Sequence, residues 1–256
     1  MDDPLILLSN DDGFFREEIQ ILFRRLKGLG RTVIVAPDRE KSATSLALTL
    51  RHPLRVHKMR PWVFAVDGTP ADCIYVALQK ILPRSPDLIV SGMNPGPNLG
   101  QQDVHYSGTV AAAVQGTFLG IPSMAVSVIP DKTGTFDLGF AVDVVRGLAG
   151  GVLAHGLPKG VTLNVNIPHP PVEGIKITKL GQKFYSPDVI EKKDPRGVSY
   201  YWIGTGNPQR LGDASTDVQA AYRGYISLTP LQSDLTHYEA LRKPFLRTLT
   251  RFPLPR

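Results

Sequence analysis

The sequence predicts an α/β fold, with a doubly wound, Rossmann-like and mostly parallel sheet followed by a C-terminal antiparallel ribbon. Short and fully apolar runs, such as Leu5–Leu8 and Leu88–Val90, have the composition of strands buried on both faces of a parallel sheet. Helical segments with an apolar stripe alternate with these runs, as in right-handed βαβ units. After Pro168 the pattern changes to proline-rich spacers and an aromatic segment, Tyr200–Ile203, which is typical of an antiparallel ribbon.

Length and composition favour a soluble globular protein. The 256 residues, 42% of them apolar, suffice for one large domain or for a domain with an appendage. No apolar run approaches the roughly 20 residues of a membrane span. The start, Met1–Pro4, lacks the basic region and apolar core of a signal peptide. The single cysteine, Cys73, excludes an intrachain disulfide, so we expect a cytoplasmic protein with no membrane partner.

The charge distribution gives little indication of a polyanionic partner. The net charge is +6, from 29 basic and 23 acidic residues. Basic residues are scattered, apart from pairs such as Arg24–Arg25 and Lys192–Lys193, and no aromatic residues are interleaved with them. This distribution favours an ordinary solvated surface, with a general attraction for small phosphates as the alternative. We expect no stable nucleic-acid partner.

The first third of the chain predicts a buried strand, an amphipathic helix, a second buried strand and a further strand, in that order. These segments are Leu5–Leu8, Ile19–Leu26, Thr32–Val35 and Val63–Val66. The helix ends at Gly28 or Gly30, and the polar stretch Arg39–Ser45 predicts a loop. Another helix begins after Thr69, the expected N-cap, because Pro70 occupies the first helical position.

The βαβ pattern continues through the middle of the chain and then weakens. The later elements are expected at Leu88–Ser91, from Gly108 onward, Ser123–Ser127, Phe136–Leu153, Thr162–Val165, Tyr225–Leu228 and Thr236–Leu249. Three glycines and two prolines lie within the nine residues after Ser91, which predicts that neither strand nor helix continues there. The second half is too thin to bury its own core, so we expect it to pack on the first half or on another subunit.

Polar side chains follow three strands of the predicted sheet, at the edge where ligands bind in open α/β sheets. They are Asp11 and Asp12 after the first strand, Ser42 after the second, and Asn94 with Asn98 after a later strand. Two carboxylates, a hydroxyl and an amide carbonyl form an all-oxygen set that suits Mg²⁺ or Mn²⁺. The alternative for Asn10–Gly13 alone is a helix cap with a turn, but the convergence of three strand ends favours a metal site.

The helix that begins at Gly108 is a candidate anion site. Its start, Tyr106–Thr109, is rich in Ser, Gly and Thr. A helix N-terminus offers free backbone N–H groups and the positive end of the helix dipole. We expect Asn98, Ser107, Gly108 and Thr109 to hold phosphate oxygens. The alternative for Ser107 is a simple helix cap.

Several other classes of site have no signature in this sequence. No Gly-x-Gly-x-x-Gly follows the first strand, and neither a Gly-Lys-Ser/Thr nor a Gly-x-Ser-x-Gly motif occurs. Nicotinamide or flavin cofactors, P-loop ATPases and serine hydrolases are therefore unsupported. The six histidines lack metal-ligand spacing. His105 is either a loop histidine or a proton donor, and Cys73 is expected in the core.

The motifs at the strand ends and in the second half resemble those of the SurE family, stationary-phase survival proteins that act as 5′/3′-nucleotidases. The matching segments run in unbroken order from about Leu5 to Leu241. They are Ser9–Gly13, Ala36–Arg39, Ser42–Ala43, Gly68–Cys73, Ser91–Gly100, Tyr106–Val110, Leu163–Pro168, Asp194–Gly197, Tyr201–Ile203, Thr216–Asp217 and Gly224–Pro230.

The resemblance implies one divalent cation per subunit, Mg²⁺ or Mn²⁺, held by Asp11, Asp12, Ser42 and Asn94, with the two aspartates also catalytic. It implies acid-phosphatase-like hydrolysis of nucleoside 5′- and 3′-monophosphates to nucleoside and phosphate, and it leaves polyphosphate open as a further substrate. It also implies homodimers or tetramers that exchange C-terminal arms. Residues 1–180 would then be the metal- and phosphate-binding core, and residues 181–256 a ribbon and helix used for oligomerisation.

The chain departs from the family pattern at Phe14–Glu18, where the family usually has small residues ending in Gly before the first helix. The change affects the rim of the pocket, and so substrate preference, rather than the metal set.

Two rival functions remain. A nucleotide-sugar transferase would need an acceptor-binding domain, and a non-catalytic nucleotide sensor with a structural metal would bind nucleotides without turnover.

Overall fold

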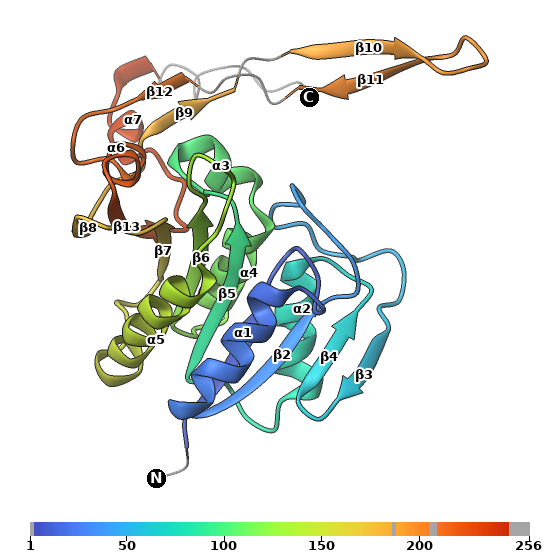
Figure 1. Ribbon diagram of the computed structural model, residues 1–256, viewed down its shortest axis with the longest axis vertical. Helices are drawn as coiled ribbons and strands as arrows, with labels where there is room; N and C mark the ends of the chain where they lie inside the picture. Colours follow the sequence, from blue (N-terminus) through green and yellow to red (C-terminus); the bar gives the residue numbers. More distant parts are fainter. Residues whose placement is uncertain (1–2, 186–187, 205–208, 246–256) are drawn as a thin grey trace, which may run out of the picture.

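The structure is a computed structural model that describes residues 3–185, 188–204 and 209–245. These residues form a nine-stranded sheet with helices on both faces (Figure 1). In spatial order its strands are β3 (Val56–Arg60), β4 (Val63–Val66), β2 (Arg31–Pro37), β1 (Leu5–Ser9), β5 (Leu88–Pro95), β6 (Ser123–Ile129), β7 (Val161–Pro168), β13 (Tyr225–Gln232) and β8 (Gly174–Ile177). Two antiparallel pairs lie apart from it: β10 (Val189–Lys193) with β11 (Ser199–Ile203), and β9 (Gln182–Phe184) with β12 (Gln209–Leu211).

The centre of the sheet is parallel, which confirms the predicted fold class. Strands β4, β2, β1, β5, β6 and β7 run in one direction, whereas β3 and β13 pair antiparallel to β4 and β7. The order reverses beside β1, because β2 and β4 extend the sheet on one side and β5, β6 and β7 on the other. Such a switch point leaves a crevice beyond the carboxyl ends of two neighbouring strands.

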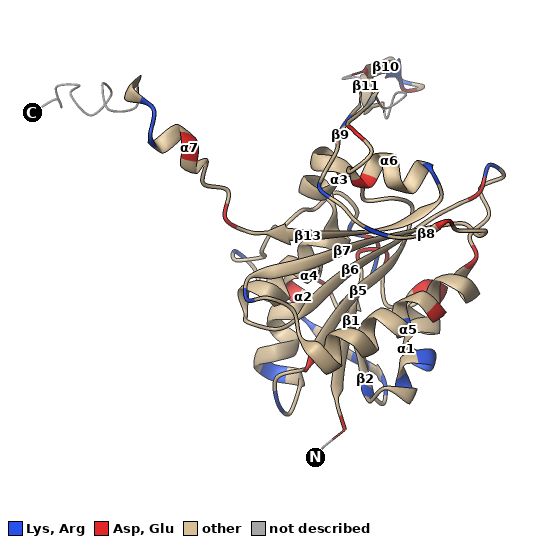
Figure 2. Cartoon of the chain, turned by 90° about the vertical axis from the view of Figure 1, so that its left-hand side faces the viewer, with Lys and Arg blue, Asp and Glu red and all other residues tan. Residues whose placement is uncertain are grey.

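Both faces of β1 are buried, and this explains its uninterrupted apolar run. Ile6 and Leu8 belong to the core shared with α1 (Glu17–Arg25) and α5 (Leu138–His155). Leu5 and Leu7 belong to the opposite core, shared with α2 (Pro70–Val76) and α4 (Gly108–Phe118). Figure 2 shows the two helix layers on either side of the sheet. A strand covered on both faces has no position left for an alternating polar residue.

Helix α5 is the one described helix that is long and apolar enough to cross a membrane by length and composition. In the fold its buried residues, among them Val142 and Val145, pack in the core that contains α1 and β1. Its opposite side is more exposed, as in a helix that covers one face of a sheet.

Local signals place several helix ends where the sequence predicts them. The Thr69 hydroxyl accepts from the Asp72 backbone N–H at 3.1 Å, and the Asp72 carboxylate accepts from the Thr69 N–H at 2.9 Å, which completes a capping box. Helix α2 continues as the π-helical segment η2 (Ala77–Ile81). Helix α1 continues as the 3₁₀ turn η1 (Leu26–Gly28), which ends at a predicted glycine stop.

The prediction that regular structure ends after Ser91 is wrong. Strand β5 continues to Pro95 across an irregularity: Ser91 pairs with Ala125, and pairing resumes at Asn94 opposite Ser127. A bulge absorbs the extra residues, so sheet pairing overrides the glycine and proline signal. A helix that the sequence did not predict, α3 (Gly100–Tyr106), follows in the expected loop. Its first N–H is held by the distant Asp217, a tertiary contact that local sequence cannot show.

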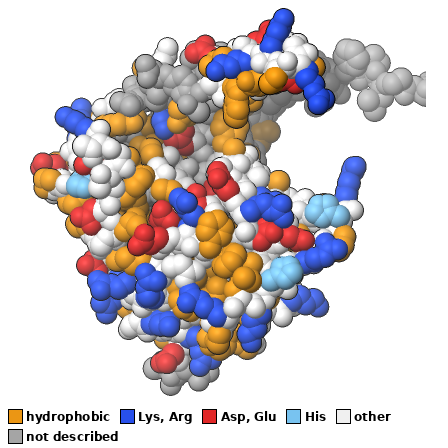
Figure 3. Space-filling model, turned by 45° about the vertical axis from the view of Figure 1, so that its right-hand side comes forward, with side chains coloured by type: hydrophobic (Ala, Val, Ile, Leu, Met, Phe, Trp, Pro, Cys, Tyr) orange, Lys and Arg blue, Asp and Glu red, His pale blue; other side chains and the backbone are white. Residues whose placement is uncertain are grey.

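The second half contributes to the main sheet as well as to separate ribbons. The predicted strand Tyr225–Leu228 is confirmed and extends to Gln232 as β13, which lies between β7 and β8, and α6 (Asp217–Tyr222) precedes it. The ribbon β10–β11, where the aromatic segment had predicted antiparallel pairing, projects from the body of the molecule (Figure 1). In the space-filling view it overhangs a hollow (Figure 3).

The predicted last helix, Thr236–Leu249, is shorter where the structure describes it. Helix α7 spans Tyr238–Leu241, and residues 246–256 of the predicted arm lie outside the described residues. The chain leaves the helix at Arg242 and Lys243 and is helical again at Pro244 and Phe245. This interruption agrees with Pro244, which disfavours helical backbone at the residue before it.

Candidate active site

The predicted site residues gather at the switch point of the sheet. Strand β1 pairs in parallel with β5, with Ser9 opposite Ser91. Asp11 therefore lies just beyond the end of one strand, and Asn94 lies near the end of its neighbour. The loop after β2 also reaches this edge, because the Lys41 N–H donates to the Asp11 carbonyl at 2.7 Å. Three strand ends thus bring residues to the same edge of the sheet, as the sequence predicts.

Asp11 faces the N-terminus of α4 directly. The Thr109 hydroxyl donates to Asp11 Oδ1 at 2.5 Å. The backbone of Gly108 passes so close that a Cβ built there would lie 2.7 Å from the Asp11 Cβ. Burial raises the pKa of Asp11, and hydrogen bonds from the Thr109 hydroxyl and from the Gly108 and Thr109 backbone counteract part of that rise. The Asp11 carboxylate and two of the predicted phosphate-binding residues, Gly108 and Thr109, are therefore in contact.

Asp12 has the properties of a carboxylate prepared for a cation. Its Oδ2 atom is buried and, among the described residues, receives no hydrogen bond. Burial, followed by the charge of Asp11, raises the pKa of Asp12 to about 7, and Glu18 and Glu40 contribute in the same direction. Two neighbouring carboxylates repel one another when both are ionised, and a divalent cation between them relieves that repulsion. The residues present therefore fit the predicted metal.

Asn94 presents an oxygen ligand. Its side-chain Nδ2 donates to the Gly96 carbonyl at 2.7 Å. This bond leaves the amide oxygen Oδ1 as the atom that can face a cation. Because amide nitrogens do not bind Mg²⁺ or Mn²⁺, this orientation is the one that a metal-ligating asparagine requires.

Ser42 lies in the loop after β2, but its hydroxyl points elsewhere. The loop is anchored to Asp11 through Lys41, whereas Ser42 Oγ donates to Glu40 Oε1 at 2.9 Å. A rotation about the side-chain torsion of this exposed residue changes that partner. Among the described residues, no group of three or more His, Cys, Asp or Glu could hold a metal. A cation here therefore depends on two carboxylates and on neutral oxygens such as those of Ser42 and Asn94.

Ser107 caps α4, and its hydroxyl hydrogen remains available for donation. Its hydroxyl oxygen accepts from the Val110 N–H at 3.1 Å, which confirms the cap. A serine hydroxyl that accepts one bond still has its own hydrogen to donate. The cap and the phosphate-binding role, posed as alternatives by the sequence, are therefore compatible in one side chain.

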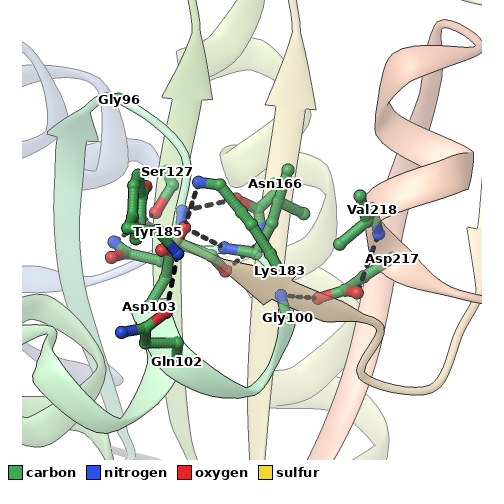
Figure 4. Close-up of polar contacts among 12 residues, drawn as sticks. Gly96, Gly100, Gln102, Asp103, Ser127, Asn166, Lys183, Tyr185, Asp217 and Val218 are labelled. Atoms are coloured by element: carbon green, nitrogen blue, oxygen red, sulfur yellow. Dashed lines mark hydrogen bonds and ion pairs between the residues drawn. The ribbon is translucent and has the colours of Figure 1, made fainter. Parts of the chain in front are cut away.

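Asn98 is held mainly by the ends of β6 and β7. Its Nδ2 donates to Ser127 Oγ at 2.8 Å, its N–H donates to Asn166 Oδ1 at 2.9 Å, and its carbonyl accepts from Asn164 and Asn166. Among the described residues, the hydrogen bonds of Asn98 join it to these strands rather than to Asp11. Figure 4 shows this network beside a second polar cluster on α3 and β9. Asn98 reaches the start of α4 only through α3, which connects the two.

Sequence reasoning missed three charged groups near the site. Glu18 and Glu40 lie close enough to affect the pKa of Asp12. Their only signal in the sequence is that they are acidic residues in or beside the expected loops. Lys183 forms a buried ion pair with Asp103 on α3. No local sequence pattern predicts this ion pair. His105 lies exposed on α3, with Nδ1 2.7 Å from the Gln101 carbonyl of the same helix.

Comparisons with known proteins agree with this geometry. The family described as "Survival protein SurE" matches residues 6–187 of the chain. The chain is 46% identical over 236 residues to a 5′-nucleotidase SurE of Syntrophotalea carbinolica, an alignment that covers 92% of this chain and 94% of the relative. It is also 46% identical over 241 residues to a 5′-nucleotidase SurE of Vibrio cholerae, covering 93% and 94%.

A solved structure shares the architecture. The crystal structure of the SurE protein from Aquifex aeolicus superposes with a TM-score of 0.82 at 39% identity. The superposition covers 95% of this chain and 100% of that one. The similarity therefore extends beyond the parallel core into the C-terminal half.

Proposed function

The chain belongs to the SurE family, and from this premise we propose that it is a metal-dependent phosphomonoesterase that hydrolyses nucleoside 5′- and 3′-monophosphates to nucleoside and phosphate. The observation that carries the proposal is the contact between Asp11 and the start of α4, where Thr109 Oγ1 lies 2.5 Å from Asp11 Oδ1. A cation on this carboxylate and a phosphate on the helix N-terminus would be neighbours. This juxtaposition is what phosphoryl transfer requires.

We assign the metal to Asp11, Asp12, Ser42 and Asn94, as one Mg²⁺ or Mn²⁺ per subunit. When bound there, the cation supplies positive charge to a phosphoryl oxygen and lowers the pKa of a water molecule. Among the described residues Asp12 Oδ2 accepts no hydrogen bond, and the Asn94 amide directs its nitrogen to the Gly96 carbonyl; both observations support the assignment. Asp11 and Asp12 are the catalytic carboxylates of this proposal, and either of them can accept the proton of the attacking water.

The chain supplies the phosphate site with neutral donors. Ser107 and Thr109 carry hydroxyls, and the first amides of α4 point out of the helix end. Gly108 leaves the backbone accessible there, since any side chain would fill the space beside Asp11. Asn98 is a more distant member of the set, because its contacts lie at the ends of β6 and β7.

Product analysis distinguishes this function from its rivals. The protein is incubated with nucleoside 5′- and 3′-monophosphates and with polyphosphate in water, with and without Mg²⁺ or Mn²⁺, and free phosphate is measured. We expect stoichiometric nucleoside and phosphate in the presence of metal, with no acceptor added. A nucleotide-sugar transferase would release no free phosphate from AMP. A sensor would bind AMP, as shown by a shifted Tm, without turnover.

We also propose that the protein is a cytoplasmic homodimer or tetramer assembled through residues 181–256. The ribbon supports this, because Trp202 and Ile203 of β11 are 63% and 85% exposed and a two-stranded ribbon is marginal in water by itself. Deletion of residues 236–256 spares β13, which ends at Gln232, and should weaken the assembly. Light scattering at micromolar concentration measures the oligomeric state of both proteins. A full-length protein that is monomeric would contradict the proposed assembly.

A further inference from the structure

A buried ion pair connects the second half of the chain to the loop between the two predicted phosphate-binding segments. Lys183, on β9, places its Nζ 2.5 Å from Asp103 Oδ2 on α3. The two side chains are only 3% and 7% exposed. Buried charges are costly and are found in proteins mainly when they are paired. We therefore expect a role of this ion pair in holding the elements that it joins. Figure 4 shows both residues within the polar cluster beneath the strand ends.

Asp103 holds both ends of α3. Its Oδ2 also accepts from the Leu99 N–H at 3.1 Å, which fixes the residue directly after Asn98. Its carbonyl accepts from the Ser107 N–H at 2.9 Å, which fixes the cap of α4. One residue thus contacts the backbone beside each of two side chains assigned to phosphate.

The residues that flank β9 make further contacts with the same helix. The Gln101 N–H donates to the Gly181 carbonyl at 3.0 Å, and the Tyr185 N–H donates to the Gln102 side chain at 3.0 Å. A Cβ at Gly100 would lie 3.0 Å from the Lys183 Cβ, so the two segments are packed as closely as glycine allows. The start of α3 and strand β9 are therefore joined by backbone hydrogen bonds and close packing.

Lys183 keeps its charge at neutral pH. Burial lowers the pKa of Lys183, but hydrogen bonds to Asp103 and Tyr185 more than compensate, so that its pKa is raised above the ordinary value. The ammonium group stays charged over the whole range in which the enzyme is tested. Its effect on Asp103 is therefore constant rather than a switch.

We propose that Lys183 is a positioning residue for phosphate binding: through Asp103 it fixes α3, and with it Asn98 and Ser107 at the two ends of that helix. The inference rests on the proposed function for the identity of the ligand. It makes the segment after residue 180 part of the active site, in addition to any role in assembly.

Four variants test the proposal. Lys183→Met removes the charge at similar length, and Lys183→Met/Asp103→Asn removes both charges, so that no buried carboxylate is left unpaired. Lys183→Arg keeps a cation. The matched control is Lys179→Met, which removes a lysine whose ion pair with Asp213 is exposed, at 63% and 64%.

The readouts are the Kd of inorganic phosphate by calorimetry, the KM and kcat for AMP, and hydrogen exchange at the Leu99 amide, all below the Tm of each variant. We expect the phosphate Kd to rise about tenfold or more in Lys183→Met and in the double variant, since a bond to a charged ligand is weakened. The Leu99 amide should exchange faster in both. Lys183→Arg should recover to within about threefold of the parent, and Lys179→Met should match it.

The outcomes separate this inference from the proposed function. A parent protein that binds phosphate but releases none from AMP defeats the proposed function, while the phosphate Kd and the Leu99 exchange still decide the role of Lys183. Parental values of both in folded Lys183→Met and in the double variant would overturn the proposal. So would the failure of both variants to fold, because the pair would then serve stability only.

Discussion

Gly108→Ala adds one methyl group at the contact between the carboxylate and the helix start. The new Cβ would lie 2.7 Å from the Asp11 Cβ, 2.9 Å from Oδ2 and 3.1 Å from Cγ. Ordinary carbon contacts are about 3.5–4.0 Å, so Asp11 or the start of α4 must move by about 1 Å. Neither neighbour is a flexible side-chain end, because Asp11 is buried and held by Thr109.

The displacement has separate consequences for activity and for stability. A misplacement of about 1 Å in a catalytic group costs roughly 100-fold in rate. Overpacking destabilises the protein by about 1–3 kcal/mol. The replacement of a helical glycine by alanine offsets about 0.5–1 kcal/mol of this loss. We therefore expect kcat/KM for AMP to fall roughly 100-fold, with a fall in Tm of about 2–6 °C.

The matched control is Gly147→Ala in α5. No heavy atom lies within 4 Å of a Cβ built at Gly147, so this variant should gain about 0.5–1 kcal/mol and keep full activity. Phosphate release from AMP with saturating Mn²⁺, together with the Tm of the metal-free proteins, measures both variants. Parental activity in Gly108→Ala would refute the placement of Asp11 against α4.

Three further substitutions address single interactions. Thr109→Val removes the donor that lowers the pKa of Asp11, so the acid limb of the pH–rate profile should move to higher pH; an unmoved limb would argue against an ionised Asp11. In the metal-free protein Asp12 keeps a proton up to pH about 7 that the unfolded chain loses near pH 4, so stability falls as pH rises between these values. Asp12→Asn should remove on the order of 2 kcal/mol of this loss of stability between pH 5 and pH 8, measured by denaturant unfolding. The same pH dependence of stability in the variant and the parent would count against the raised pKa of Asp12. Ser107→Ala should lose about 1 kcal/mol of stability as a cap of Val110, and a further 1.5–3 kcal/mol in kcat/KM, roughly, if it binds phosphate; normal kinetics would leave only the cap.

The parallel core and the strand-end residues could be predicted from the sequence because both depend on local pattern. Leu5–Leu8 is apolar throughout because both faces are covered, and Thr69 with Pro70 and Asp72 forms the cap that its residue types favour. Asp11 and Asp12 follow a buried strand directly, so their place at the sheet edge follows from the fold class.

The errors concern features that depend on distant contacts. The continuation of β5 beyond Ser91 depends on pairing with β6. Helix α3 depends on Asp217, which holds the Gly100 N–H from more than a hundred residues away. Lys183 has no local signal, because its partner Asp103 lies eighty residues earlier. The position of β13 beside β7 likewise depends on pairing between strands that are distant in the sequence.

We propose that the ends of β1 and β5 hold a cation that phosphomonoester hydrolysis requires. Phosphate release from AMP is measured in metal-stripped protein during a titration with Mn²⁺. We expect no release without metal and a plateau when one ion per chain is bound, with Asp11→Asn and Asp12→Asn inactive across the titration although folded. Full activity of the stripped protein, or of either variant, would contradict it.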